Sequence, residues 1–212
     1  LEDAILHLRL NELEIGTLIF KTQVSKDLDD PAAVLAYDAF LEAHKAHWLV
    51  REIRNTWKRT LKRIDVTSRS LVALIEPGSC FAGTLAEIAF AADRAYMLAG
   101  TMKGDNRPEA HMTLSPLNFG AYPMSNGLTR LATRFLGEPE SVVTAQGKLG
   151  GALDASDCET IGLVTASYDE IDWDDEVGIF LEERTSFSAD SLTGLEANLR
   201  FAGPETMETK IF

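Results

Sequence analysis

LVALIEPGSCFAGTLAEIAFAADRAYML, residues 71–98, carries the clearest pattern of strands and helices in the chain. Residues 70–75 read SLVALI, and the unbroken apolar run after the serine is typical of a strand that is buried on both faces. Residues 76–79 form a turn, and small and apolar side chains at helical spacing follow over 81–93. Residues 95–98 are a second short strand. A strand, a helix and another strand in this order favour a parallel sheet with helical cover.

Strands and helices are expected to follow one another before and after residues 71–98 as well. We expect further strands at 17–20, 112–114 and 163–166. Helices are expected over 1–13, over 31–64 with a break near 44–48, and over 128–135, 139–146, 155–161, 173–185 and 190–201. The polar residues 100–110 are expected to form a mobile loop. The sequence thus predicts one α/β domain over residues 1–212, with a parallel-rich sheet, helical cover and C-terminal helices.

The two ends of the sequence suggest a piece of a longer polypeptide. The chain begins with Leu1 rather than Met, and residues 207–212 mix apolar and charged types instead of fading into a polar tail. We therefore expect the domain to be incomplete at both ends. Its function is expected to depend partly on sequence that lies outside it.

Composition limits the partners and the compartment. The net charge is −13, and so negative a surface repels a phosphate backbone, so nucleic acid is not an expected partner. The one dense basic run, residues 51–63, is expected to be a solvated helix face. Cys80 and Cys158 show neither metal nor disulfide spacing, and no apolar run reaches the roughly 18 residues that span a bilayer. These features predict a cytoplasmic protein with no membrane partner and no metal, flavin or nicotinamide.

The helix that starts at residues 82–84 follows a buried strand after a short turn. N–H groups at a helix start attract negative charge, and they would suit a carbonyl oxygen that becomes an enolate. Gly83 would let another group approach the backbone closely. A plain strand–turn–helix connection that uses glycine for packing is the other interpretation, and both stay open.

Three motifs, in order along the chain, point to one family. Glu87-Ile88-Ala89 is followed by Asp93, residues 118–131 read NFGAYPMSNGLTRL, and residues 152–164 run from Ala-Leu-Asp-Ala to Gly-Leu-Val. This set resembles the crotonase superfamily, the enoyl-CoA hydratases and isomerases. The resemblance implies a ClpP/crotonase-like fold. It also implies an acyl-CoA thioester that enters as substrate, so that no separate cofactor is needed.

The same resemblance implies site residues. Glu87 would be the catalytic acid–base, and Gly83 and Thr84 would form the oxyanion hole, with the Thr84 N–H as a donor. The alternative is that Glu87 is a helix glutamate that bonds Arg94 or another basic group, and this alternative stays open.

Two departures from the hydratases imply reduced chemistry in this segment. Pro116, which has no titratable group, stands where the second glutamate of the hydratase pair would fall. Residues 23–30, QVSKDLDD, lead directly into a helix and offer no equivalent of the family's first oxyanion loop. Removing one oxyanion donor typically costs roughly 100- to 1,000-fold in rate.

A narrower resemblance rests on strings that are not general crotonase features: IEPGSCFAGT at 75–84, NFGAYPM at 118–124, IDWDDE at 171–176, LTGLEANLRF at 192–201 and GPETMET at 203–209. They look like the C-terminal half of the benzoyl-CoA-dihydrodiol lyases. That resemblance implies a lyase that opens the ring of an oxygenated benzoyl-CoA in aerobic aromatic degradation. It implies the N-terminal half of the same polypeptide and further copies of the chain as partners, with this segment as a supporting half.

Two alternatives remain open on the sequence alone. The segment could hold its own thioester site and act as a hydratase or isomerase that uses Glu87. It could instead be a non-catalytic dimerisation domain, with the helices at 173–185 and 190–201 as its interface.

Overall fold

The computed structural model of the protein describes residues 1–23 and 31–200. Four strands form one sheet in the order β1-β2-β3-β4, and every neighbouring pair is parallel. The strands are β1 (Thr17–Phe20), β2 (Ser70–Ile75), β3 (Arg94–Leu98) and β4 (Ala166–Tyr168). The parallel sheet that the sequence predicts is therefore confirmed.

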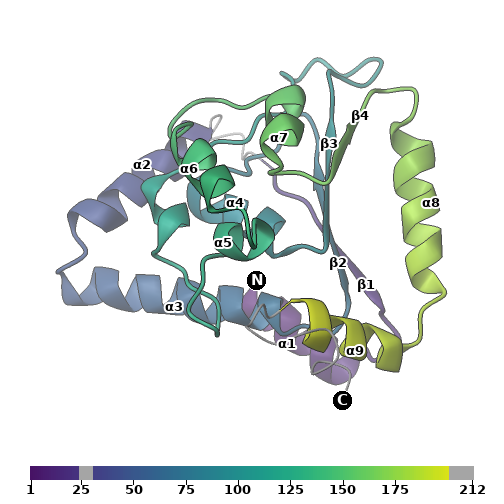
Figure 1. The fold of residues 1–212 in the computed structure, drawn as a ribbon, viewed down its shortest axis with the longest axis horizontal. Coiled ribbons are helices and arrows are strands. Elements are labelled where there is room, and N and C mark those ends of the chain that lie inside the picture. The colour runs from purple at the N-terminus through teal and green to yellow at the C-terminus, as the bar shows by residue number, and fades with distance from the viewer. Residues whose placement is uncertain (24–30, 201–212) are drawn as a thin grey trace.

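Helices connect the strands and surround the sheet (Figure 1). They are α1 (Glu2–Asn11), α2 (Pro31–Ala43), α3 (Trp48–Asp65), α4 (Gly83–Ala91), the 3-10 helix η1 (Pro116–Phe119), α5 (Arg130–Arg134), α6 (Pro139–Gln146), α7 (Ala155–Ile161), α8 (Trp173–Thr185) and α9 (Ala189–Leu199). In Figure 1, α8 stands alone along one side of the sheet, and α4 to α7 lie on the other side. No helix within the described residues is long and apolar enough to cross a membrane.

Alternate residues of β2 pack into two separate cores. Leu71, Ala73 and Ile75 face the larger core on the side of α4. Val72 and Leu74 belong to a smaller cluster with Trp173 and Val177 of α8. All six residues of β2 are buried, which confirms the prediction of a strand covered on both faces. Each fully buried large apolar side chain stabilises the fold by about 1.5–3 kcal/mol.

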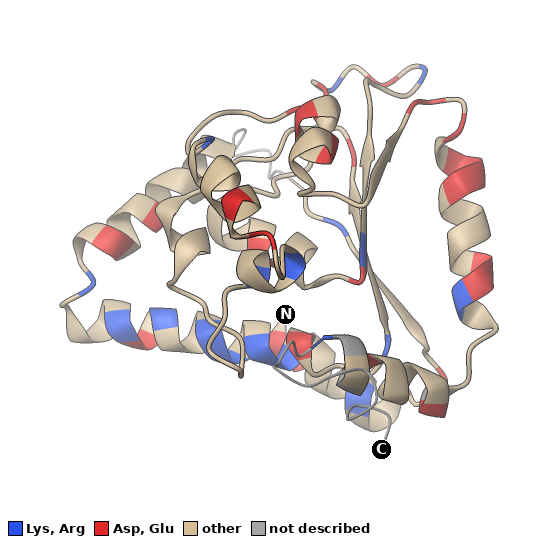
Figure 2. Cartoon of the chain, in the orientation of Figure 1, with Lys and Arg blue, Asp and Glu red and all other residues tan. Residues whose placement is uncertain are grey.

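The long helical pattern over 31–64 breaks where the sequence predicts a break. Helix α2 ends at Ala43 and α3 begins at Trp48, with the side chain of His47 accepting a hydrogen bond from the Leu49 N–H. Lysine and arginine positions recur along the length of α3 (Figure 2). None of the lysines and arginines in the run 51–63 is buried, as expected for a solvated face.

Two predicted strands differ from the structure. Residues 112–114 form only isolated bridges, because Met112 exchanges hydrogen bonds with Leu153 rather than with the sheet. The last strand begins at Ala166, not at Leu163. Leu163 is buried in the turn after α7, where its N–H donates to Cys158 O. Its apolar side chain therefore packs in the core without belonging to a strand.

The helix predicted over 128–135 is shorter, covering Arg130–Arg134.

Candidate functional site

The turn before α4 places Gly83 in a conformation that few other residues adopt. Its φ is +47°, and its N–H donates to Thr113 O at 2.8 Å. A Cβ atom added to Gly83 would lie 2.1 Å from Oδ2 of Asp38. Glycine therefore allows a carboxylate from α2 to approach the start of α4 closely.

The carboxylate of Asp38 occupies the N-terminus of α4. Its Oδ2 accepts from the Thr84 N–H at 2.8 Å and from the Ser115 hydroxyl at 2.7 Å, and its Oδ1 accepts from the Thr84 hydroxyl. Only 1% of Asp38 is exposed. Burial raises the pKa of Asp38, and the hydrogen bonds from Thr84 and Ser115 oppose that shift. Both backbone donors predicted for an oxyanion hole, the N–H groups of Gly83 and Thr84, thus have acceptors inside the chain.

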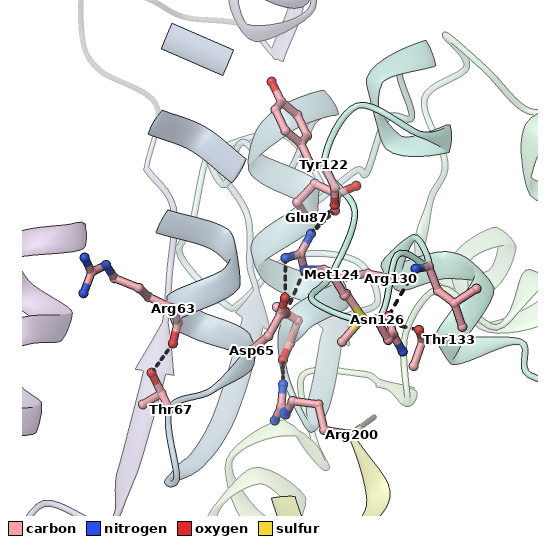
Figure 3. A network of polar contacts seen from close by, with 12 residues as sticks. Arg63, Asp65, Thr67, Glu87, Tyr122, Met124, Asn126, Arg130, Thr133 and Arg200 are labelled. Atoms are coloured by element: carbon pink, nitrogen blue, oxygen red, sulfur yellow. Dashed lines mark hydrogen bonds and ion pairs between the residues drawn. The ribbon is translucent and has the colours of Figure 1, made fainter. Parts of the chain in front are cut away.

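Glu87 lies one turn further along α4 and is 1% exposed. Its Oε1 accepts from Asn118 Nδ2 at 2.8 Å, and its Oε2 accepts from Arg130 Nη1 at 2.8 Å. Figure 3 shows Arg130 between Glu87 and Asp65. The basic partner of Glu87 is therefore Arg130 and not Arg94. Burial raises the pKa of Glu87, against the opposing effects of Arg130 and Asn118.

Arg130 is the centre of this buried network. Its Nε and Nη2 donate to the two carboxylate oxygens of Asp65 at 2.9 and 2.6 Å, a bidentate pair. Its Nη1 also donates to the carbonyl oxygen of Tyr122 at 2.9 Å. Burial raises the pKa of Asp65 as well, and Arg130 opposes the shift. One guanidinium therefore joins the end of α3 to the middle of α4 and to the loop before α5.

Two further side chains connect this network to Asp38. Asn118 donates to Gly83 O at 2.9 Å in addition to Glu87, and the Tyr122 hydroxyl lies 3.0 Å from the Thr84 hydroxyl oxygen. Burial raises the pKa of Tyr122 to about 12, so the phenol stays protonated at neutral pH. A continuous chain of polar contacts thus runs from Asp38 to Asp65 around α4.

The three residues that the family resemblance singles out are brought together on α4, and none of them lines the cavities of about 340, 710 and 390 Å³ that lie among the described residues. The catalytic role of Glu87 and the oxyanion role of Gly83 and Thr84 stay predictions. Sequence reasoning missed Asp38, whose place inside an apolar helical pattern gives no sign of its partner. It also missed Arg130 as the partner of Glu87, although the family run over 118–131 contains that arginine.

A separate cavity of about 710 Å³ opens at the carboxyl ends of the strands. Gln23, just after β1, and Gly78 and Ser79, just after β2, contribute to its wall, together with His111 and Thr113. The hydroxyl of Ser79 is buried and has no hydrogen-bond partner among the residues that the structure describes. Ligands of open α/β sheets bind outside the carboxyl ends of the strands. This cavity is therefore where the fold favours a ligand.

Neither cysteine resembles a reactive group. Cys80 and Cys158 are both free and buried. Burial raises the pKa of Cys158 to about 12, so it remains a thiol at neutral pH. Within the described ranges, no three His, Cys, Asp or Glu side chains gather as a metal site requires.

Comparisons with known proteins identify the fold and a close relative. Two solved structures of enoyl-CoA hydratase/isomerases each match 99% of this chain. The one from Cupriavidus metallidurans CH34 has a TM-score of 0.64 and 17% sequence identity, and 71% of its own chain is covered. The one from Marinobacter aquaeolei has a TM-score of 0.62 and 15% sequence identity, and 75% of its own chain is covered. The chain therefore has the crotonase-like α/β fold that the sequence predicts.

The similarity in sequence is narrower. Over all 212 residues the chain is 50% identical to the benzoyl-CoA-dihydrodiol lyase of Aromatoleum evansii, which confirms the resemblance drawn from the short strings. The chain spans 36% of the length of that relative. No family model matches the chain.

Proposed function

We propose that this chain is a supporting part of a longer enzyme that cleaves a carbon ring in a coenzyme A thioester. The identity to a benzoyl-CoA-dihydrodiol lyase supports an oxygenated benzoyl-CoA as the substrate of that enzyme. The catalytic groups then come from the other part of the polypeptide, which we expect to precede this segment, and further copies of the enzyme complete the assembly.

The main argument for a supporting role is one hydrogen bond: the carboxylate of Asp38 accepts from the Thr84 N–H. A thioester oxygen at this position would have to displace a buried carboxylate with three hydrogen bonds and would meet its negative charge. Glu87 is equally occupied, since each of its oxygens already has a partner. A general acid–base must reach the proton that it moves, and Glu87 does not line the cavity at the carboxyl ends of the strands.

The substitution Glu87→Gln in the complete polypeptide tests this proposal. Steady-state turnover of the thioester substrate is expected to keep its kcat within about threefold of the unchanged enzyme, because glutamine preserves the shape of the side chain. Removal of a true catalytic acid–base would lower kcat by about 100- to 10,000-fold.

Asp65→Asn is the matched control, because Asp65 contacts the same guanidinium but is not a predicted site residue. An equal, small loss in both variants would reflect the weakened network. A loss of 100-fold or more in Glu87→Gln, together with near-normal kcat in Asp65→Asn, would place catalysis on α4 and overturn the supporting role.

A second candidate function is thioester binding in the cavity at the carboxyl ends of the strands. The buried, unpartnered Ser79 hydroxyl in its wall favours this function, because a ligand carbonyl or hydroxyl would satisfy it. Ala152→Trp would fill part of this cavity. Calorimetric titration with benzoyl-CoA is then expected to give a dissociation constant about tenfold higher or more. A tenfold rise corresponds to a loss of about 1.4 kcal/mol of binding free energy.

Ala46→Trp is the control for that experiment, because Ala46 is exposed between α2 and α3 and does not line the cavity. Equal affinity in both tryptophan variants and in the unchanged protein would show that the thioester binds elsewhere.

A further inference from the structure

A second cavity, of about 340 Å³, lies at the opposite edge of the sheet, near the amino ends of the strands. Arg69 immediately precedes β2, Arg94 is the first residue of β3, and both line it. The remaining wall comes from the ends of α3 and α4, from α5 and the loop before it, and from the region of α8 and α9. This cavity shares no lining residue with the one at the carboxyl ends.

The wall of this cavity is strongly basic in a chain whose net charge is −13. Its acidic side chains number three: Asp65, Asp93 and Glu196. Its arginines number six: Arg69, Arg94, Arg130, Arg134, Arg184 and Arg200. The local field is therefore opposite in sign to the charge of the whole chain, which makes a local anion site compatible with an acidic protein.

Three of the arginines are already used by the fold. Arg130 pairs with Asp65 and Glu87, as described above. Arg200 pairs with Asp93 and lies 3.5 Å from Glu196. Arg69 donates to three backbone carbonyl oxygens at the end of α1 and beyond, at distances of 2.7 to 3.2 Å.

The other three, Arg94, Arg134 and Arg184, have no carboxylate partner within residues 1–23 and 31–200. Arg134 donates from Nε to Gly162 O at 2.6 Å, and its terminal amino groups have no such acceptor in the same residues. Arg184 lies over the rings of Phe180 and Phe187, at 5.0 and 5.3 Å from their centroids, which leaves its donors uncommitted.

Arg134 lies in an unfavourable environment for a cation, beside the exposed Arg94. Burial lowers the pKa of Arg134, and the positive charge of Arg94 lowers it further. Two like charges that face one cavity repel each other, and a negative ligand between them would reverse that effect. Guanidinium groups are also the side chains that best match phosphate oxygens, through paired N–H donors.

We propose that this cavity binds a small phosphate monoester. Its phosphate group is held by Arg94, Arg134 and Arg184, which together can donate to several oxygens of one dianion. Its organic part lies against the apolar side chains of the same wall, which include Phe90, Leu192 and Leu195. The volume is at the lower end of the range for small-molecule sites, so the organic part is no larger than about one ring.

Phenyl phosphate is the probe, titrated into the complete protein by calorimetry. Arg94→Gln is the main variant, because Arg94 is exposed and its replacement removes no described contact. The dissociation constant is expected to rise by about tenfold or more, the usual effect of losing one charge-assisted hydrogen bond. Arg184→Gln, on α8 rather than on β3, is expected to weaken binding in the same direction.

Arg51→Gln is the matched control, since Arg51 is an exposed arginine on α3 that lies outside the cavity. It is expected to leave the dissociation constant unchanged. Inorganic phosphate is expected to bind more weakly than phenyl phosphate, and phenol is expected not to bind. Equal affinity of the unchanged protein, Arg94→Gln and Arg184→Gln for phenyl phosphate would overturn the proposal, and so would phenol binding as tightly as phenyl phosphate.

Discussion

Arg130→Met is expected to lower the free energy of unfolding by about 3–5 kcal/mol, because it leaves two buried carboxylates without their shared cation. Arg130 is only 2% exposed, so its removal leaves both carboxylates in a largely buried environment. Urea denaturation followed by circular dichroism measures the change. A loss below about 1 kcal/mol, which is the range of a surface ion pair, would contradict the network described here.

Two controls separate the buried charge from the loss of arginine itself. Arg51→Met removes an exposed arginine and is expected to change stability by no more than about 0.5 kcal/mol. The triple variant Asp65→Asn, Glu87→Gln, Arg130→Met removes all three charges together. It is expected to be more stable than Arg130→Met alone, because replacing a whole buried ionic group costs far less than breaking it.

Gly83→Ala is expected to destabilise the protein by more than about 3 kcal/mol. The new Cβ would overlap the Asp38 carboxylate, and alanine at φ +47° adds backbone strain of about 1–3 kcal/mol. Gly104→Ala is the matched control, with φ +83° and no atom within 4 Å of its added Cβ. The difference between the two variants in thermal or urea denaturation isolates the overlap from the strain.

A double-mutant cycle with Asp38→Ala tests the cause directly. Once the carboxylate is removed, Gly83→Ala is expected to cost less than in the unchanged protein, with a coupling energy of about 1–3 kcal/mol between the two positions, and the Ser115 hydroxyl at 3.2 Å is the one close side-chain contact that remains. An unchanged penalty in the Asp38→Ala background would mean that the strain of the turn, and not the carboxylate, requires glycine.

Periodicity predicts most of the fold, because each element has to match the core that it faces. The unbroken apolar run of β2 and the helices at Pro139–Gln146, Ala155–Ile161 and Trp173–Thr185 follow directly from spacing and end signals. The prediction is wrong at 163–165, where the buried side chains of Leu163 and Val164 belong to a turn. Burial and strand pairing are different requirements, and an apolar run reports only the first.

The candidate site is less accessible to sequence reasoning, because its contacts join residues far apart in the chain. Asp38 and Thr84 are 46 positions apart, and Asp65 and Arg130 are 65 apart. The sequence shows Glu87 and the start of its helix, since both belong to one local motif. It does not show that a carboxylate from α2 lies at that helix start, because the packing of α2 against α4 decides this contact.

The Asp38 carboxylate has a further consequence for the chemistry of this fold. It is a ligand tethered by the chain itself, so its effective concentration at the start of α4 far exceeds that of any diffusing anion, in the way that linked binding groups outcompete free ones. The contact therefore holds α2 and α4 together at all times. Exchange of Asp38 for a small neutral residue would free the Thr84 N–H for another acceptor, whereas the Gly83 N–H would still donate to Thr113 O.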